Sequence, residues 1–203
     1  AFGRRGAAPA GQLADELLKG SGRMGERKLA GRNAQDWQCA VYEALREAGI
    51  TIVAYVPDGG HRRLIELCAA DPAMRSVPLT TEAEGPCLLA GAWLGGRRGV
   101  LLMQSSGLGN CINNFGLIKA GQFPFLTLIT VRGSWGEVNP WMLYMGRSTR
   151  PLLELADFHA YEVDAPEDAA PTVAAAAQMV FSCSSGAGVM FTQRLTGAKR
   201  FKA

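Results

Sequence analysis

The sequence predicts an α/β fold in which helices cover both faces of an open, doubly wound parallel sheet. Short apolar runs of strand length alternate along the chain with helix-length segments whose apolar residues recur three or four positions apart. The strand-length runs are apolar at nearly every position, which is typical of strands that are covered on both faces. Such sheets bind ligands beyond the carboxyl ends of their strands, so functional residues are expected directly after each run.

The chain has 203 residues, which suits one α/β domain with an extension. Residues 1–32 are rich in Gly, Ala, Arg and Lys and show no sustained apolar period, so we expect a flexible N-terminal extension there. Residues 33–203 show the alternating pattern throughout and are expected to form the folded domain.

The first elements follow from helix caps and chain breakers. Asn33 is expected to cap a helix whose apolar face includes Val41 and Leu45. Gly49 is expected to end this helix, and the apolar run at residues 51–56 predicts the first strand. The next expected elements are helices over residues 61–70 and 82–94, and strands over residues 75–79 and 99–104.

The second half of the chain continues the alternation. A glycine-containing loop after Gln104 is expected to lead into a helix over residues 110–120. Residues 124–131 are apolar except for Thr127 and Thr130 and predict a central strand, which a long polar loop follows. The remaining expected elements are a helix from about residue 150, a strand near residue 161, a helix over residues 166–181 and a strand over residues 188–192.

Composition excludes several classes of protein. The net charge of +3 is small and sits largely in the two tails, so the basic stripe of a nucleic-acid-binding face is missing. No apolar run is long enough to span a membrane, and the first residues lack the hydrophobic segment of a secretory signal. The five cysteines contain no CxxC pair, so we expect buried free thiols rather than a zinc site or disulfides. A cytoplasmic protein is the expectation.

The first segment that could carry chemistry is TTEAEG at residues 80–85, directly after a predicted strand. Glu82 and Glu84 are acids at the start of a helix, where the helix dipole alone favours negative charge. The helix that follows is small or apolar on every side, so it is expected to be buried or to lie at an interface. A carboxylate at the mouth of such an environment tends to exchange protons. A capping role and a catalytic role are both open on this evidence.

The second segment is QSSGLGN at residues 104–110, which again follows a predicted strand. Backbone amides in such a loop suit the close approach of an anion or a flat ring. Ile112 stands where a dinucleotide-binding fingerprint requires its third glycine, so that motif is absent. A tight turn without a ligand explains the glycines equally well.

The third segment follows the predicted central strand and contains two arginines, Arg132 and Arg147. Together they could clamp a carboxylate, sulfonate or phosphonate. The alternative is that both pair with Glu137 or with solvent. His61 starts a predicted helix after the first strand, where it is either a capping or surface residue or a substrate contact. A serine triad is not supported, because the chain has two histidines and no GxSxG motif.

In order along the chain, these segments resemble one known family. The motifs are VPD at residues 56–58, TEAEG at 81–85, AGAWLGG at 90–96, LMQSSGLGN at 102–110, RG at 132–133, GEVNP at 136–140 and MGR at 145–147. They are similar to the alpha subunit of sulfopyruvate decarboxylase and to the front part of phosphonopyruvate decarboxylase, over residues 36–201. The resemblance implies the pyrimidine-binding domain of a thiamine-diphosphate enzyme.

The resemblance also implies an activity, the decarboxylation of 3-sulfopyruvate or 3-phosphonopyruvate. A carboxylate in this domain activates the aminopyrimidine of thiamine diphosphate, and alignment of the motifs places it at Glu82, with Glu84 as the fallback. Cofactor-binding residues are expected in the segment after the third strand and substrate-binding residues after the first and fourth. The first group is Gln104, Ser105, Ser106, Gly107 and Asn110, and the second is His61, Arg132 and Arg147.

One departure from the family pattern affects the expected partner. The diphosphate-binding half of these enzymes carries a Gly-Asp-Gly motif and a later Asn that hold Mg²⁺, and this sequence contains neither that motif nor a replacement carboxylate pair. The resemblance therefore implies a beta subunit that binds Mg²⁺ and the diphosphate, in a heteromer with this chain. Two other functions stay open, a non-catalytic regulatory domain with the same fold and a thiamine-diphosphate enzyme of carboligase type.

Overall fold

The computed structural model describes residues 36–198. The predicted extension over residues 1–32 and the predicted cap at Asn33 lie outside the described residues. The first described helix begins at Trp37, and its N-cap is Asp36, whose side chain accepts a hydrogen bond from the Cys39 N–H. The cap position is thus occupied by an acid three residues after the predicted Asn.

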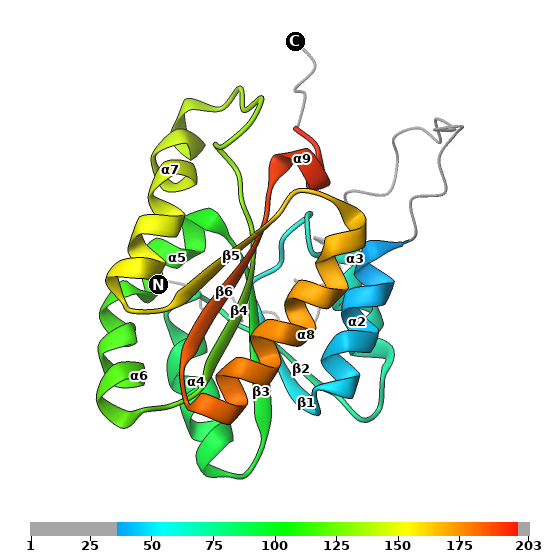
Figure 1. Ribbon diagram of the computed structural model, residues 1–203, viewed down its shortest axis with the longest axis vertical. Helices are drawn as coiled ribbons and strands as arrows, with labels where there is room; N and C mark the ends of the chain where they lie inside the picture. Colours follow the sequence, from blue (N-terminus) through cyan, green and yellow to red (C-terminus); the bar gives the residue numbers. More distant parts are fainter. Residues whose placement is uncertain (1–35, 199–203) are drawn as a thin grey trace, which may run out of the picture. The chain divides into compact units, whose positions relative to one another are not determined.

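The described residues form a six-stranded sheet with the strand order β2-β1-β3-β4-β6-β5. Every pairing is parallel, so the predicted fold class is confirmed (Figure 1). The strands are β1 (Ile50–Tyr55), β2 (Arg75–Pro78), β3 (Arg98–Gln104), β4 (Phe125–Thr130), β5 (His159–Val163) and β6 (Gly186–Phe191).

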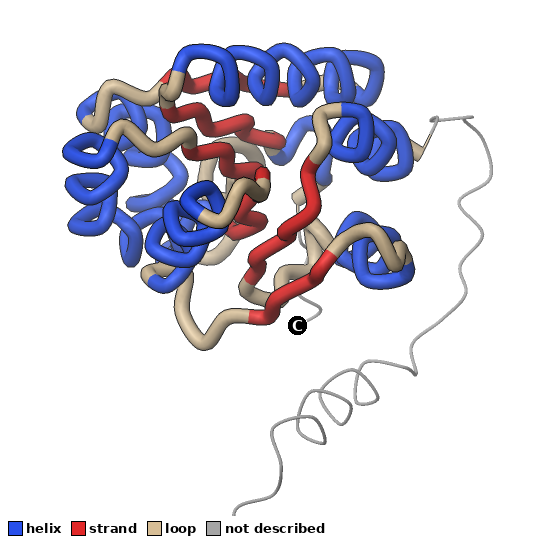
Figure 2. The backbone as a smooth tube through the Cα atoms, turned by 90° about the horizontal axis from the view of Figure 1, so that it is seen from below, coloured by secondary structure: helices blue, strands red, loops and turns tan. Residues whose placement is uncertain are grey.

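Helices cover both faces of this sheet, and the strands run between them in Figure 2. One face carries α2 (Trp37–Glu47), α3 (Arg62–Ala70) and α8 (Pro166–Cys183). The other carries α4 (Glu84–Leu94), α5 (Ser105–Cys111), the 3₁₀ turn η1 (Ile112–Asn114), α6 (Phe115–Gly121) and α7 (Pro140–Leu155). A short helix, α9 (Gln193–Thr196), follows β6.

The apolar core is divided by the sheet into two clusters. Along β3, Val100 and Leu102 belong to the cluster under α2 and α8, whereas Leu101 and Met103 belong to the cluster under α4 to α7. This alternation is the period of a strand, in which successive side chains point to opposite faces. All residues of β4 and β6 are buried, which explains why these runs are apolar at nearly every position.

Two segments that were predicted as loops are helical. Helix α5 begins at Ser105, directly after β3, so the expected glycine loop before residue 110 is wrong. Helix α7 begins at Pro140 instead of near residue 150. The Asn139 side chain accepts the N–H of Trp141 at 3.1 Å, and proline suits the first position of a helix. The Asn-Pro pair is therefore a helix start inside the segment that was predicted as a polar loop.

All five cysteines are free. Cys68 and Cys111 are buried, as predicted, and Cys39 is half-buried. Cys87 and Cys183 are exposed, so the prediction of burial is wrong for these two. Across residues 36–198, no helix is both long enough and apolar enough to cross a membrane.

Candidate active site at the carboxyl edge of the sheet

The segments with predicted functional residues follow β1, β2, β3 and β4. Because all strands are parallel, the carboxyl ends of these strands lie at one edge of the sheet. The loop before α7 and the helix α9 lie at the same edge (Figure 1).

Glu82 lies in the turn between β2 and α4 and contacts two residues of α5. Asn110 Nδ2 donates a hydrogen bond to Glu82 Oε2 at 2.9 Å. A β-carbon on Gly107 would lie 2.4 Å from both Cδ and Oε1 of Glu82, so only glycine allows the carboxylate to reach the helix backbone there. The structure thus brings together Glu82, Gly107 and Asn110, three of the predicted site residues.

The turn that carries Glu82 is held from α5 and η1. The Cys111 thiol donates to the backbone oxygen of Glu82 at 3.2 Å, and Asn114 Nδ2 donates to the backbone oxygen of Ala83 at 2.6 Å. Burial, reinforced by the negative charge of Glu82, raises the pKa of Cys111 to about 12. The thiol therefore stays protonated at neutral pH and can keep donating this hydrogen bond.

Glu84 is placed differently. It is exposed in the first turn of α4, and its Oε2 accepts the backbone N–H of Thr80 at 3.3 Å. This contact satisfies an amide near the start of α4, which is the capping role that the sequence left open for an acid here. Glu84 makes no hydrogen bond to α5 within the described residues, whereas Glu82 does.

A second carboxylate, Asp58, lies at the centre of this edge. Its Oδ1 accepts from Gln104 Nε2 at 3.1 Å, and its Oδ2 accepts from Thr130 Oγ1 at 2.5 Å. Ser106 Oγ donates to Gln104 Oε1 at 3.1 Å. The network joins the ends of β1, β3 and β4. Asp58 was part of the VPD motif but was not predicted as a site residue, although its place directly after the first strand was a usable signal.

Ser105 joins β3 to β4 and does not face solvent. It is fully buried, and its Oγ accepts the Arg132 N–H at 3.1 Å and donates to the Arg132 backbone oxygen at 3.4 Å. These two hydrogen bonds thus link the chain just beyond the end of β3 to the chain just beyond the end of β4. Its role in this structure is to fix where α5 starts.

Arg132 pairs with Glu137, which is the alternative that the sequence left open. Its Nε and Nη2 donate to the two carboxylate oxygens at 2.9 and 2.8 Å, and the Glu137 side chain is only 1% exposed. Burial acts to raise the pKa of Glu137, but hydrogen bonds from Arg132 and from the Asn139 N–H outweigh it and lower the pKa. The guanidinium is therefore already bound to an internal carboxylate.

Arg147 lies on α7 and is exposed. It makes no ion pair within residues 36–198. Arg147 lies one helical turn before Arg150. The guanidinium of Arg150 donates hydrogen bonds to Ala160 and Glu162 of β5. Met145, which contacts Gly109 of α5, lies on the other side of the helix. Arg147 therefore lies on the flank of α7 that faces β5. The opposite flank of α7 faces α5, the helix that contacts Glu82.

His61 is completely buried in the core under α2 and α8. Its Nε2 is 3.0 Å from the Leu128 backbone oxygen, and its ring meets Phe191 edge-on. Burial lowers the pKa of His61, which favours the neutral ring, and the carbonyl partner requires the proton on Nε2. In the described chain this side chain has no exposed surface for a ligand.

Gln193 is a residue at this edge that the sequence interpretation missed. Its Oε1 accepts the N–H groups of Gly133, Ser134 and Trp135, and its Nε2 donates to Glu137. It follows the last strand, so the rule that pointed to the other strand ends would also have pointed to it. Among the described residues, no group of three or more His, Cys, Asp or Glu side chains is arranged to hold a metal ion.

No protein-family model matches the chain. It is 33% identical over 153 residues to the sulfopyruvate decarboxylase subunit alpha of Methanocaldococcus jannaschii, covering 75% of this chain and 90% of that protein. It is 37% identical over 131 residues to the same subunit of Methanococcus maripaludis, of which it covers 78%. It is 41% identical over 111 residues to the phosphonopyruvate decarboxylase of Streptomyces viridochromogenes, but covers only 28% of that longer protein.

Two solved structures share the fold over about a third of their own length. One is a 2-oxoglutarate:ferredoxin oxidoreductase from Magnetococcus marinus, with a TM-score of 0.63, 14% identity, and coverage of 91% of this chain and 34% of that one. The other is a thiamine diphosphate-dependent 4-hydroxybenzoylformate decarboxylase from Rhodococcus jostii, with a TM-score of 0.62, 18% identity, and coverage of 82% and 34%. The sheet is thus the fold of a thiamine-diphosphate-enzyme pyrimidine-binding domain, and by its sequence the chain belongs to the family of sulfopyruvate decarboxylase alpha subunits.

Proposed function

We propose that this chain is the alpha subunit of a thiamine-diphosphate-dependent decarboxylase of 3-sulfopyruvate or 3-phosphonopyruvate, with Glu82 as the activating carboxylate. The observation that carries the proposal is the contact of Glu82 with Gly107 and Asn110 of α5. It supports a carboxylate that is held in one orientation at the carboxyl edge of the sheet, where such folds bind ligands. Three relatives that the chain covers to more than three quarters of their length are named sulfopyruvate decarboxylase subunit alpha.

One carboxylate oxygen of Glu82 is available to a ring nitrogen of the cofactor. Asn110 holds Oε2, whereas no described residue donates a hydrogen bond to Oε1, which lies against the bare backbone of Gly107. That oxygen can share a proton with a ring nitrogen. When bound, thiamine diphosphate would supply an acidic C2 carbon and an electron sink for loss of carbon dioxide. Glu82 would hold the proton at the aminopyrimidine nitrogen, and α5 would keep the carboxylate in place.

Ser106 and Gln104 extend the same surface toward Asp58. They form a hydrogen-bonded line across the ends of β1, β3 and β4. We infer that this line orients the side of the site where the 2-oxo acid binds, because it begins in the same helix as Gly107. Of the two predicted arginines, Arg132 is already paired with Glu137, whereas Arg147 makes no ion pair within residues 36–198. Arg147 is therefore the candidate for the anionic group of the substrate, although it lies on the flank of α7 away from Glu82.

A partner subunit is part of the proposal. Exposed large apolar side chains of the described residues lie on α4, η1, α6, α7 and the loop before α7, and none lies on α2, α3 or α8. Large exposed apolar areas mark interaction sites. The relatives are named alpha subunits, which supports a beta subunit on this side of the molecule. That subunit would carry the Gly-Asp-Gly motif and Mg²⁺, and residues 33–203 of this chain would be the pyrimidine-binding domain after an N-terminal extension.

Two single substitutions in the complex reconstituted with a diphosphate-binding subunit test this proposal. Glu82→Gln keeps the size of the side chain but removes its proton exchange, so we expect decarboxylation of sulfopyruvate to slow by about a hundredfold or more. Glu84→Gln is the matched control and should leave the rate within about twofold, since Glu84 only caps Thr80. An unchanged rate for Glu82→Gln would overturn the assignment, and a loss confined to Glu84→Gln would transfer the role to that residue.

A further inference from the structure

We propose that Gln193 is a positioning residue. Its side-chain amide fixes the conformation of the loop after β4 and, through this loop, the start of helix α5 beside Glu82. We call the hydrogen bonds from Gln193 to this loop the lock. The inference rests on the proposed function for its catalytic consequence, while the lock itself is a property of this chain alone. Gln193 is 1% exposed and lies at the first position of α9, far in sequence from the residues that it contacts.

One end of the Gln193 amide gathers three consecutive backbone N–H groups. Its Oε1 is 3.0 Å from Gly133 N, 3.2 Å from Ser134 N and 3.1 Å from Trp135 N. Successive amides that converge in this way form a concave site for a negatively polarised oxygen. The Gly133 amide is buried, and a buried amide that loses its acceptor costs free energy, so the loop conformation depends on this oxygen.

The other end of the amide reaches the ion pair of the same loop. Gln193 Nε2 donates to Glu137 Oε2 at 3.1 Å, the oxygen that also accepts Arg132 Nε. One side chain therefore spans the loop from residues 133–135 to residue 137. An amide is suited to this position because it accepts at one end and donates at the other, which neither a carboxylate nor an apolar side chain does.

The lock is connected to the candidate site by short contacts. Arg132 bonds Ser105 through both its N–H and its backbone oxygen, and Ser105 is the first residue of α5. The same helix carries Gly107, which lies against Glu82. The loop is also pressed against α7, since a β-carbon on Gly133 would lie 2.1 Å from the Met142 backbone oxygen. A loosened loop would thus release one anchor of the helix that orients Glu82.

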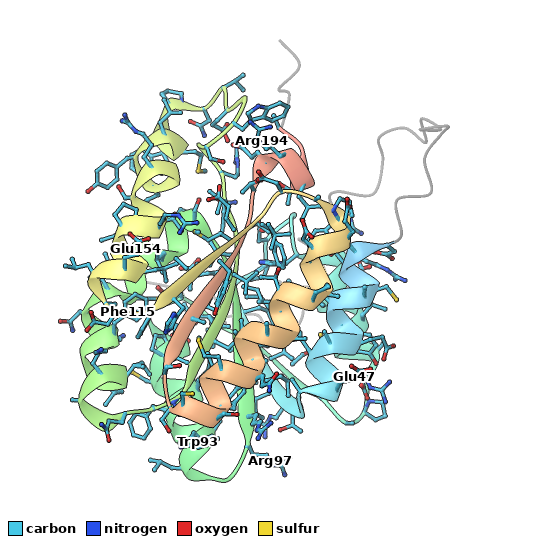
Figure 3. The ribbon with its side chains drawn as sticks, in the orientation of Figure 1. Glu47, Trp93, Arg97, Phe115, Glu154 and Arg194 are labelled. Atoms are coloured by element: carbon cyan, nitrogen blue, oxygen red, sulfur yellow. The ribbon has the colours of Figure 1, made fainter. Side chains whose placement is uncertain are left out.

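The charged groups around Gln193 come from its own helix, from the loop after β4 and from the turn before α8. The loop contributes Arg132 and Glu137. Arg194, labelled in Figure 3, has its guanidinium 5.9 Å from the centre of the Trp135 ring and its Nε 3.9 Å from Asp164 of the turn before α8. Within residues 36–198, Glu137 is the only carboxylate that the Gln193 side chain bonds, so a second carboxylate at position 193 would face Glu137 directly.

Hydrogen exchange of the isolated full chain tests the lock without any need for activity. In Gln193→Met, which keeps the length but removes donor and acceptor, we expect the amides of Gly133, Ser134 and Trp135 to exchange at least about tenfold faster. Gln178→Met is the matched control, because Gln178 is an exposed glutamine of α8 without a hydrogen bond to the described residues. Unchanged exchange at these three amides would overturn the proposal.

Gln193→Glu keeps the test falsifiable if the methionine variant does not fold. This variant retains the acceptor for the three amides but sets a negative charge beside Glu137 instead of a donor. Two adjacent carboxylates share a proton more readily as the pH falls, because like charges raise the pKa of one of them. We therefore expect weakened protection at pH 7 that recovers toward the wild-type value near pH 5, and protection that is independent of pH would contradict the lock.

Steady-state kinetics of the reconstituted complex test the catalytic consequence. Because the lock acts on α5 and Glu82, Gln193→Met should lower kcat by about tenfold and leave the KM for the 2-oxo acid within about twofold. A raised KM with unchanged kcat would contradict the route through Ser105. If the wild-type complex shows no decarboxylation, the proposed function fails, while the exchange result still decides whether the lock exists.

Discussion

Gly107 and Glu82 are in direct contact only because residue 107 has no side chain. A β-carbon there would lie 2.4 Å from Cδ and Oε1 of the carboxylate and 2.5 Å from its Cγ. The sequence predicts this glycine in a loop before residue 110, but it lies inside helix α5, at a position where a carboxylate approaches the helix backbone. Its role is to leave space for Glu82, and the space can be removed by one methyl group.

Gly107→Ala is predicted to reduce activity while the fold persists. The new methyl group would displace the carboxylate of Glu82 by an ångström or more, which costs about a hundredfold in rate when the group must be aligned. Alanine otherwise favours a helix, so the melting temperature should change little. Steady-state rates and thermal unfolding measure the two effects. Gly109→Ala is the control, because its β-carbon would lie 3.5 Å from the flexible Met145 side chain; equal losses in both variants would refute the contact.

Glu137→Gln is predicted to destabilise the fold in a pH-dependent way. The pKa of Glu137 is lowered in the folded chain, so its stabilisation is present above the unfolded-state pKa of about 4.3 and is lost as the pH falls through the lower folded-state pKa. Removing the charge of this buried carboxylate, which pairs with Arg132, should cost about 3 kcal/mol at pH 7. Denaturant titrations at pH 7 and below pH 4 should show the difference from wild type shrinking.

A surface ion pair provides the comparison for that experiment. Arg62 and Glu66 pair on α3 with side chains 63% and 51% exposed. Glu66→Gln should change the free energy of unfolding by less than about 0.5 kcal/mol at either pH. Equal losses of unfolding free energy in Glu137→Gln and Glu66→Gln would contradict the prediction that the buried Arg132–Glu137 pair stabilises the fold more than the exposed pair does.

Substitution of the two predicted substrate-binding arginines is expected to have different effects on KM and on the melting temperature. Arg147→Gln removes an exposed charge, so it should raise the KM for the anionic 2-oxo acid by about tenfold and leave the melting temperature unchanged. Arg132→Gln breaks the pair with Glu137 and should lower the melting temperature by several degrees. A raised KM for Arg132→Gln at unchanged stability would reverse the two assignments.

The proposed partner surface can be blocked on α4. Leu94 is 76% exposed at the end of that helix, and Gly91, one turn earlier, has no atom within 4 Å of its β-carbon position. Leu94→Glu should abolish co-purification with the beta subunit while the isolated chain keeps its melting temperature, because a charge buried at an interface is costly. Ala175→Glu on α8, exposed on the opposite face, should bind the partner as wild type does. Loss of binding in both would place the interface elsewhere.

The sheet could be predicted from the sequence because it depends on short-range patterns. Residues 124–131 are apolar except for two threonines, and β4 is indeed a central strand that is buried at every position. Glu82, Gly107 and Asn110 could be predicted as neighbours because parallel strands place their following segments at one edge. These inferences required no knowledge of side-chain conformation.

Pairings that depend on loop conformation could not be predicted in the same way. Arg132 and Glu137 meet because Gln193, 56 positions from Glu137, folds the loop between them. His61 was expected at a helix start facing outward or toward substrate. The chain passes so close to β4 at Gly60, where a β-carbon would lie 2.6 Å from Thr130 Cγ2, that the next side chain enters the core.

The position of β6 has a consequence for how the chain is made. β6 is the last strand of the described residues in sequence, yet it lies between β4 and β5. As the chain leaves the ribosome, β5 has no strand to pair with, and one edge of β4 stays open until Gly186–Phe191 has been synthesised. An apolar strand edge that stays unpaired in this way is prone to associate with other chains. Release of the nascent chain before residue 191 would therefore leave an aggregation-prone fragment, and the sheet can close only after β6 has been synthesised.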